Sequence, residues 1–252
     1  MALADILDRV RAQGATLTVL NRTDPEPVQN MLENLFDGTD VAVTEARTAG
    51  EAPANLVVLE VEDGLAVSTL DEVRENVLLV NSDLYVTGTR PLEEVATPDA
   101  IAELSDLPFR VRGYPDTTKG KYMLIEISRY IEARAAKAGV GTLRSGFQAL
   151  SRIEDEIGTS AVYERLAGTD LDVHVYGVPD AEPSLGLTVH GEDVPEIRDS
   201  WFVVYSHPSE PERSAALLAL LADDEGANEW RGFWTYDSER VAEIEEYLAT
   251  AY

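Results

Sequence analysis

The stretch that decides the fold is TLTVLNRTDPEPVQNMLENLFDG, residues 16–38. Its first five residues are typical of a short apolar strand. Asp24 then stands where a helix N-cap is expected, and Pro25 follows at the first helical position. Apolar residues recur at helical spacing after it, namely Val28, Met31, Leu32 and Leu35. Because Gly38 then ends the pattern, this stretch predicts a strand, a capped loop and an amphipathic helix.

The same alternation continues outward along the chain. Strands are predicted over 40–43, 56–61, 143–147, 171–176, 187–189, 201–205 and 215–221, and the last of these is also compatible with a helix by composition. Helices are predicted over 5–13, 97–104, 122–138 and 160–166, and from an Asp237 cap onward. Residues 70–80 fit either a helix or a buried strand. This alternation predicts an α/β fold with a mixed, mostly buried sheet that carries helices on both faces.

Pro108 and a loop over 113–120 divide this pattern into two halves. We therefore expect an N-terminal α/β region over residues 1–110 and a second region over 111–252. The two halves are compatible either with separate domains or with one compact unit, because no long linker lies between them.

The charge of the chain is strongly acidic. Its 252 residues include 47 Asp and Glu against 20 Lys and Arg, a formal net charge of −27. Such an excess destabilises the compact state through self-repulsion, and in molar salt the Debye length of about 3 Å removes most of that repulsion. The composition is typical of a cytoplasmic protein from an organism with a high-salt cytoplasm.

Composition also excludes several classes of function. No window supplies the basic face that nucleic-acid binding requires, so no nucleic-acid partner is expected. No apolar run approaches the ~20 residues that span a bilayer, and the N-terminus does not have the pattern of a signal peptide. The absence of Cys excludes disulfides, thiol catalysis and thiolate zinc sites.

Catalytic and metal motifs are not found. His174, His190 and His207 are scattered singly without metal-ligand spacing, and no G-x-S-x-G nucleophile turn is present. Neither a catalytic residue nor a metal site is therefore predicted. Lys119 and Lys121 are two of the three lysines and precede the longest predicted helix, where they are compatible either with an anion site at the helix start or with surface ion pairs.

Polar residues fall out of step with the core pattern in the second half. Ser128 and Glu132 share one face of the 122–138 helix, and Gln148 follows Phe147 at a predicted strand end. Large aromatic residues recur nearby, namely Tyr130, Trp201 and Trp234. A few polar groups among rings are typical of a ligand pocket, so these seven residues form the hypothetical site. Core packing is the alternative role of the rings.

Six segments occur in a characteristic order: SRYIE (128–132), GFQ (146–148), YERLA (163–167), VHVYG (173–177), WFVV (201–204) and GFWTYD (232–237). In this order they resemble the DICT sensory domain, a family associated with diguanylate cyclases and two-component systems. The resemblance covers about residues 112–250. It implies an α/β module that senses an undefined cue and acts on a separate output domain, and it brings no catalytic residues with it.

The expected function is thus that of a stand-alone sensory or regulatory protein, not an enzyme, which binds an unidentified small molecule and has its output partner in another chain. No cofactor is implied. One alternative is a nucleotide- or phosphate-ester-binding enzyme that uses residues 21–24 and 119–121 as anion loops. Another is a transcription regulator that uses residues 91–107 as a helix-turn-helix, although that segment has several acids and no Arg or Lys. Glu132→Gln and Gln148→Ala are expected to keep the melting temperature of the unliganded protein and to lose its rise with ligand.

Overall fold

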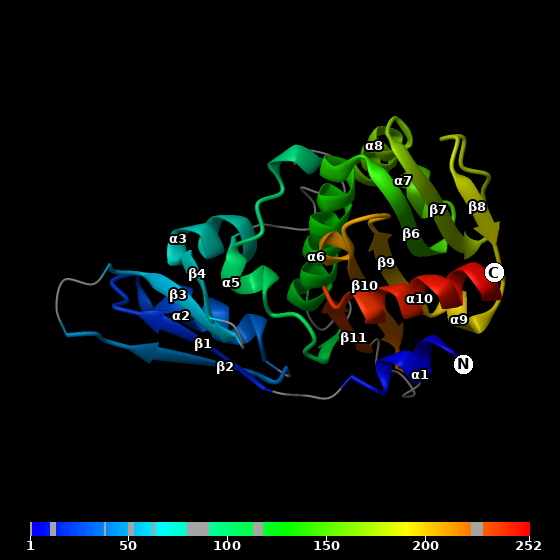
Figure 1. Ribbon diagram of the computed structural model, residues 1–252. Coiled ribbons are helices and arrows are strands. Elements are labelled where there is room, and N and C mark those ends of the chain that lie inside the picture. Colours follow the sequence, from blue (N-terminus) through cyan, green and yellow to red (C-terminus); the bar gives the residue numbers. More distant parts are fainter. Residues whose placement is uncertain are drawn as a thin grey trace.

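Two mixed sheets form the framework of the protein (Figure 1). The computed structural model describes residues 2–10, 14–37, 39–49, 53–61, 64–79, 91–112, 118–222 and 229–252. The predicted α/β class is confirmed, but the strands divide into a sheet of four and a sheet of seven instead of forming one.

The four-stranded sheet has the order β2-β1-β3-β4. Its strands are β1 (Ala15–Leu20), β2 (Val41–Ala46), β3 (Leu56–Val61) and β4 (Gly64–Thr69). Only the β1–β2 pair is parallel among them. One face packs against α2 (Glu26–Leu35), α3 (Leu70–Val73), the π-helical turn η1 (Arg74–Leu78) and α5 (Asp99–Ala102). Residues 70–78 are therefore helical, which settles the ambiguity of their sequence.

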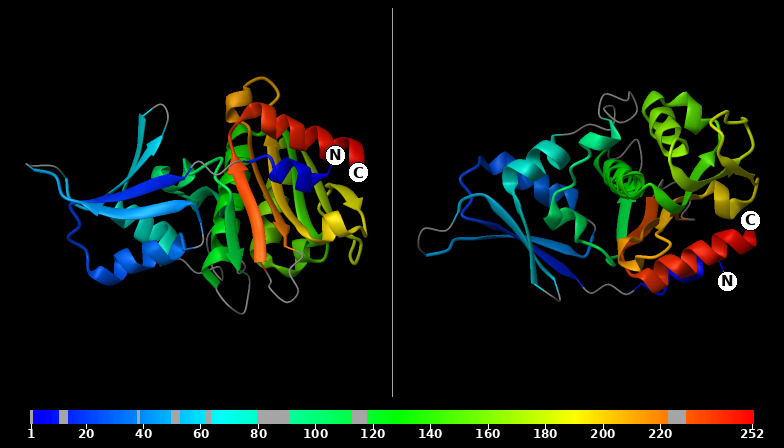
Figure 2. Two further views of the ribbon diagram at one scale, coloured as in Figure 1. Left: turned by 90° about the horizontal axis from the view of Figure 1, so that it is seen from below. Right: turned by 45° about the horizontal axis from the view of Figure 1, so that its top comes forward.

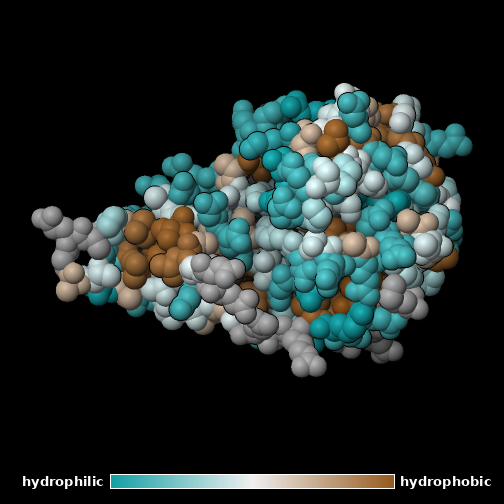
Figure 3. Space-filling model, in the orientation of Figure 1, coloured by the Kyte–Doolittle hydropathy of each residue, from teal (hydrophilic) through white to brown (hydrophobic). Residues whose placement is uncertain are grey.

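The other face of this sheet is covered by no helix of the described residues, and apolar side chains gather there as a patch (Figure 3). Side chains alternate between faces along each strand. In β4, Ala66 and Ser68 are buried under the helices, whereas Leu65 and Val67 on the opposite face are 66% and 42% exposed.

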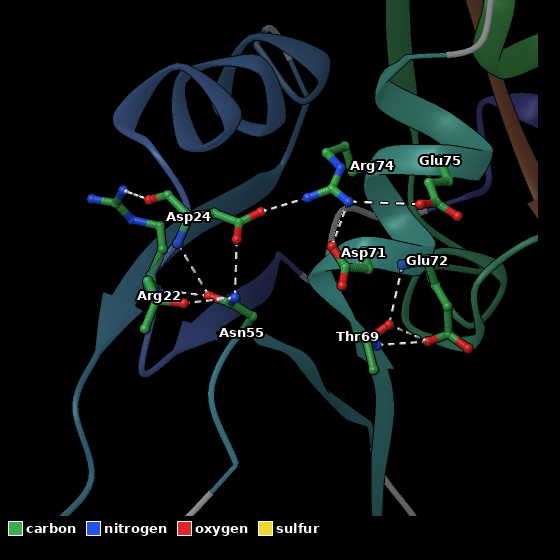
Figure 4. A network of polar contacts seen from close by, with 9 residues as sticks. Arg22, Asp24, Asn55, Thr69, Asp71, Glu72, Arg74 and Glu75 are labelled. Carbon is green, nitrogen blue, oxygen red and sulfur yellow. Dashed lines mark hydrogen bonds and ion pairs between the residues drawn. The ribbon is translucent and has the colours of Figure 1, made fainter.

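Asp24 does not cap α2, contrary to the prediction. Pro25 is the N-cap residue, and its ring offers no side-chain hydrogen bond. The Asp24 carboxylate instead accepts hydrogen bonds from Asn55 (3.0 Å) and Arg74 (2.9 Å), within a network that also contains the Thr69 cap of α3 (Figure 4). The competing partners from β3 and η1 explain why the carboxylate turns away from the amides of α2.

The seven-stranded sheet has the order β5-β11-β10-β9-β6-β7-β8. Its strands are β5 (Phe109–Arg112), β6 (Val140–Ala149), β7 (Asp170–Val178), β8 (Thr188–Gly191), β9 (Ser200–Ser206), β10 (Ala215–Leu221) and β11 (Glu229–Thr235). The β6–β7 and β7–β8 pairs are parallel and the other pairs are antiparallel.

Helices cover both faces of this sheet (Figure 2). One face packs against α6 (Thr118–Ala138), α7 (Arg152–Asp155) and α8 (Ile157–Ala167). The other packs against α1 (Leu3–Leu7), α9 (Pro195–Arg198) and α10 (Ser238–Ala251). The predicted Asp237 cap of α10 is confirmed, because its side chain accepts hydrogen bonds from the amides of Glu239 and Arg240. A 3₁₀ turn, η3 (Pro211–Arg213), precedes β10.

The two sheets share one hydrophobic core. A continuous cluster of buried residues runs from β1 and β3 through α5 and α6 to β9 and β10. Helix α1, at the beginning of the chain, packs beside α10 on the far face of the second sheet. The expected boundary near residue 110 falls within β5. Residues on both sides of it belong to the same core clusters, so the two halves pack against each other.

Residues 91–107 do not form a helix-turn-helix. They contain the 3₁₀ turn η2 (Leu92–Glu94) and the four-residue α5, and Ala100, Ile101 and Ala102 are buried in the core. Within the described ranges, no helix combines the length and the apolar character that crossing a bilayer requires.

Candidate functional site

A cavity of about 110 Å³ lies beside α6, where this helix meets β6, β9 and the beginning of α8. Fourteen residues line it: Ile125, Ser128, Arg129, Glu132, Ser145, Gly146, Phe147, Gln148, Arg152, Glu156, Thr159, Tyr163, Trp201 and Val203.

Helix α6 contributes one stripe of side chains to this cavity. Residues 125, 128, 129 and 132 are three and four positions apart, which places them on one face. On the neighbouring face, Ile127 and Ile131 are each 1% exposed and pack into the core. The polar residues that interrupt the core pattern of the sequence are thus those that face the cavity.

An ion pair is buried in the wall of the cavity. The distance from Arg129 Nη1 to Glu132 Oε2 is 2.6 Å, and the two side chains are 9% and 3% exposed. Arg129 Nη2 donates to Thr159 Oγ1 at 2.9 Å, and the Tyr163 hydroxyl donates to Glu132 Oε1 at 2.9 Å. Both oxygens of Glu132 are therefore occupied, as a stable buried pair requires.

This environment shifts two pKa values. Burial acts to lower the pKa of Arg129, but the Glu132 carboxylate outweighs it and the net pKa is above its usual value. Burial is the main cause that raises the pKa of Tyr163 well above its usual range, and Glu132 adds to this effect. At neutral pH Arg129 is charged and Tyr163 is uncharged.

Aromatic rings form the apolar walls. Trp201 from β9 donates from its indole Nε1 to Ser128 Oγ at 3.0 Å, which ties the ring to α6. Phe147 from β6 packs edge-on against Tyr163, with 5.1 Å between ring centroids. The hydrogen bond fixes the plane of the Trp201 indole, so the cavity has a defined aromatic wall.

Gln148 lies at an irregularity of β6. Its φ of +56° is in the left-handed region, and the register of β6 with β7 shifts between Gly146 and Ala149. The other non-glycine residues with positive φ are Asn or Asp, which tolerate this region better than Gln. The Gln148 side chain donates to the Ser200 carbonyl at 2.7 Å and accepts from Arg152 at 2.8 Å. These bonds hold a strained residue at the cavity.

Ser145 places a hydroxyl in the wall of the cavity, beside the Tyr163 phenol. The residue is 1% exposed. Its Oγ has no hydrogen-bond partner of ordinary geometry among the described residues, although it lies near enough to Tyr163 to favour ionisation of that phenol. Because buried hydroxyls are normally hydrogen-bonded, Ser145 marks a position where a further molecule fits.

The structure brings five of the seven predicted site residues together, namely Ser128, Glu132, Phe147, Gln148 and Trp201. Tyr130 and Trp234 lie elsewhere, which corrects the predicted grouping. Tyr130 packs edge-on against Tyr236, and Trp234 is 5% exposed, packs on Phe109 and donates to the Ala102 carbonyl. For these two rings the alternative of core packing fits the structure.

The structure changes the effect expected of the two test substitutions, Glu132→Gln and Gln148→Ala. Glu132 is the counter-charge of a buried Arg129, and Gln148 supports the strand irregularity through its side chain. Substitution of either residue therefore disturbs the fold as well as the cavity, so the expectation of an unchanged melting temperature is revised.

None of the three histidines lines the cavity. The side chains of Lys119 and Lys121 are outside the described residues, so the anion-site hypothesis stays a prediction. His174 and His190 converge on neighbouring strands β7 and β8, with 2.9 Å between Nδ1 and Nε2. His207 instead accepts from the amides of the following turn. In the described part of the chain, no three His, Asp or Glu side chains are grouped so as to hold a metal ion.

Sequence reasoning missed several residues of the cavity, above all Arg129, Ser145, Thr159 and Tyr163. Arg129 was within reach of the helical pattern, because it is three residues from Glu132 and of opposite charge. Ser145 and Tyr163 belong to a strand and a different helix, and no spacing in the sequence connects them.

No family model matches the chain, and no curated protein matches it significantly. The resemblance to the DICT domain therefore stays a prediction that depends on the six sequence segments.

Proposed function

We propose that this chain is a sensory or regulatory protein of the DICT type whose cavity beside α6 binds a small organic ligand. The observation that carries the proposal is the unpartnered hydroxyl of Ser145, buried in a cavity with aromatic walls. Ligand sites are mostly apolar hollows with a few well-placed polar groups, and this cavity has that composition.

Binding without catalysis fits the lining better than an enzymatic role. None of the fourteen described residues that line the cavity is His, Cys or Lys, three of the residue types that act as bases or activated nucleophiles. Glu132 is a poor general base, because both of its oxygens already accept hydrogen bonds from Arg129 and Tyr163. The residues are suited to hold a molecule and not to transfer its protons.

The wider setting of the proposal follows from composition and resemblance. A net charge of −27 favours a cytoplasm with concentrated salt as the working solvent. The DICT resemblance implies that the output is in a partner protein. The change that reaches such a partner would start at α6, since this helix lines the cavity and also belongs to the core shared by the two sheets.

The two alternatives receive less support. The loop at 21–24 is occupied by its own contacts, because Asp24 binds Arg74 and Asn21 donates to Thr48, which leaves no evident cradle for a phosphate. For a transcription regulator, residues 91–107 offer only a 3₁₀ turn and a one-turn helix, too short to enter a major groove.

The proposal is tested by native mass spectrometry of the full chain purified in molar KCl and exchanged rapidly into a volatile salt at equal ionic strength. We expect a co-purified small molecule, and we expect Ser145→Ala to reduce its occupancy while Ser160→Ala, in α8 but not in the cavity lining, does not. If no compound co-purifies and no fraction of a cell extract raises the melting temperature, the cavity is not a ligand site.

A further inference from the structure

The chemical character of the cavity narrows the class of ligand, starting with its hydrogen-bond donors. A guanidinium has five N–H donors, and Arg129 uses one for Glu132 and one for Thr159. Three N–H groups of Arg129 are thus left without an acceptor among the described residues. The unpartnered hydroxyl of Ser145 adds a fourth donor.

The two carboxylates and the amide oxygen of the cavity each already accept at least one hydrogen bond from the protein. Each oxygen of Glu132 accepts one hydrogen bond, Glu156 accepts from Thr159, and the Gln148 carbonyl accepts from Arg152. Arg129 and Ser145 thus have donors without an acceptor among the described residues, and a molecule that complements them supplies acceptor oxygens or nitrogens.

The charges that line the cavity also favour an acceptor-bearing, anionic ligand over a cationic one. Two arginines and two glutamates line the cavity, Arg129 and Arg152 against Glu132 and Glu156, in a chain whose acids outnumber its bases by 47 to 20. The positive end of the α8 dipole adds to this, because the N-cap Glu156 and Thr159 of the first turn both line the cavity. On this acidic molecule the cavity is a place where an anion is not repelled.

The volume of the cavity and its aromatic lining limit the size and shape of the ligand. A cavity of about 110 Å³ is somewhat smaller than an apolar cavity of about 150 Å³ that accepts benzene, so it encloses at most part of a substituted ring and the rest lies toward the side that faces solvent. Trp201 and Phe147 offer aromatic surfaces, and planar rings stack or pack edge-on against such walls with a gain beyond their area. Arg152 is exposed and places its charge at the side of the cavity that faces solvent.

We infer that the ligand of this site is a carboxylate carried on a single aromatic ring, with its oxygens on Arg129 and Ser145. This inference rests on the proposed function and specifies its ligand class. A carboxylate supplies two acceptor oxygens for the unused donors, and charge-assisted hydrogen bonds of this kind are the strong ones.

The test is a calorimetric titration of the full chain in molar KCl with four probes of similar size. Benzoate carries both features, benzamide removes the charge, benzylammonium reverses it, and cyclohexanecarboxylate removes the aromatic ring. We expect benzoate to bind at least ten-fold more tightly than each of the other three.

Substitutions in the cavity lining test whether benzoate binds there. Ser145→Ala removes only an unpartnered hydroxyl, so the fold is kept, and we expect benzoate affinity to fall about ten-fold or more. Arg152→Gln is expected to weaken it a few-fold, whereas Arg198→Gln removes an equally exposed charge from α9, outside the cavity, and is expected to have no effect.

Three outcomes overturn the inference, and only the third also overturns the proposed function. If benzamide or benzylammonium binds as tightly as benzoate and Ser145→Ala weakens that binding, the ligand class is wrong while the proposed function stands. If none of the probes binds although native mass spectrometry finds a co-purified compound, the class is again wrong. If neither experiment finds any bound molecule, the proposed function fails together with the ligand class.

Discussion

At the scale of single residues, Glu132 holds a buried guanidinium, so its neutralisation is expected to be costly. Glu132→Gln leaves Arg129 without its counter-charge, and removal of one partner of a buried pair costs about 3–5 kcal/mol. We expect the free energy of unfolding, from urea denaturation in molar KCl, to fall by this amount. The matched control Glu164→Gln, exposed on α8, is expected to change it by less than about 0.5 kcal/mol.

A double variant completes this test. Arg129→Met together with Glu132→Gln removes both charges, so most of the lost stability is expected to return. A single Glu132→Gln variant as stable as the wild type would contradict the buried ion pair.

Tyr163 gives a second prediction, on alkaline stability. Its pKa is raised in the folded state, so above about pH 10 the folded protein holds a proton that the unfolded chain has lost. The free energy of unfolding therefore falls as pH rises beyond that point. We expect Tyr163→Phe to be less stable at neutral pH, since Glu132 loses a hydrogen bond, and the gap to the wild type to narrow as pH increases. If the difference in the free energy of unfolding between the two proteins is the same at all pH values, the pKa of Tyr163 is not raised in the folded state.

The sequence allowed the residues of the cavity to be predicted only where they interrupt a periodic pattern. Ser128 and Glu132 stood out because polar side chains flanked the apolar face of a long helix. Tyr130 was grouped with them by proximity in sequence, yet two residues correspond to about 200° around a helix, which directs it to the opposite side. Ser145 could not be found, because its lack of a partner depends on side chains from other elements.

At the scale of elements, the Phe202 ring of β9 lies so close to β6 that glycine is required at position 146. A Cβ at Gly146 would lie 2.5 Å from Phe202 Cε1, on the strand paired with it. We expect Gly146→Ala to lower the free energy of unfolding by about 1–3 kcal/mol through overpacking.

The control for this prediction is a compensating change. Phe202→Leu creates space next to residue 146, so the double variant is expected to lose less than the sum of the two single losses in urea denaturation. Strictly additive losses would mean that Phe202 is not the obstacle.

Most elements could be predicted, because strands such as β1 and β3 and helices such as α6 and α10 have clear periodicity and caps. Three strands were missed, namely β4, β5 and β11. The first reason is length, since β5 has only the four residues FRVR. In β11 the aromatic run is interrupted by Arg231 and Gly232, and in β4 the sequence GLAVST begins with glycine and alternates only weakly. The division into two sheets depends on pairing between distant segments, such as β5 with β11, which local patterns do not encode.

At the scale of the whole molecule, the charge of −27 predicts salt-dependent stability. In dilute buffer the carboxylates repel one another, and in molar KCl this repulsion is screened. We expect the melting temperature, followed by circular dichroism, to rise from dilute buffer to molar KCl, with the native spectrum recovered when salt is restored. A melting temperature that does not change with salt would contradict this account.

The measurement that tests the central claim most directly is a crystal structure of the protein purified in molar KCl and soaked with the compound, or with the extract fraction, that raises its melting temperature. The account predicts electron density for one small molecule within hydrogen-bond distance of Ser145 Oγ and in contact with Trp201. Density for ordered water alone in the cavity, or for the molecule at another place, would contradict it.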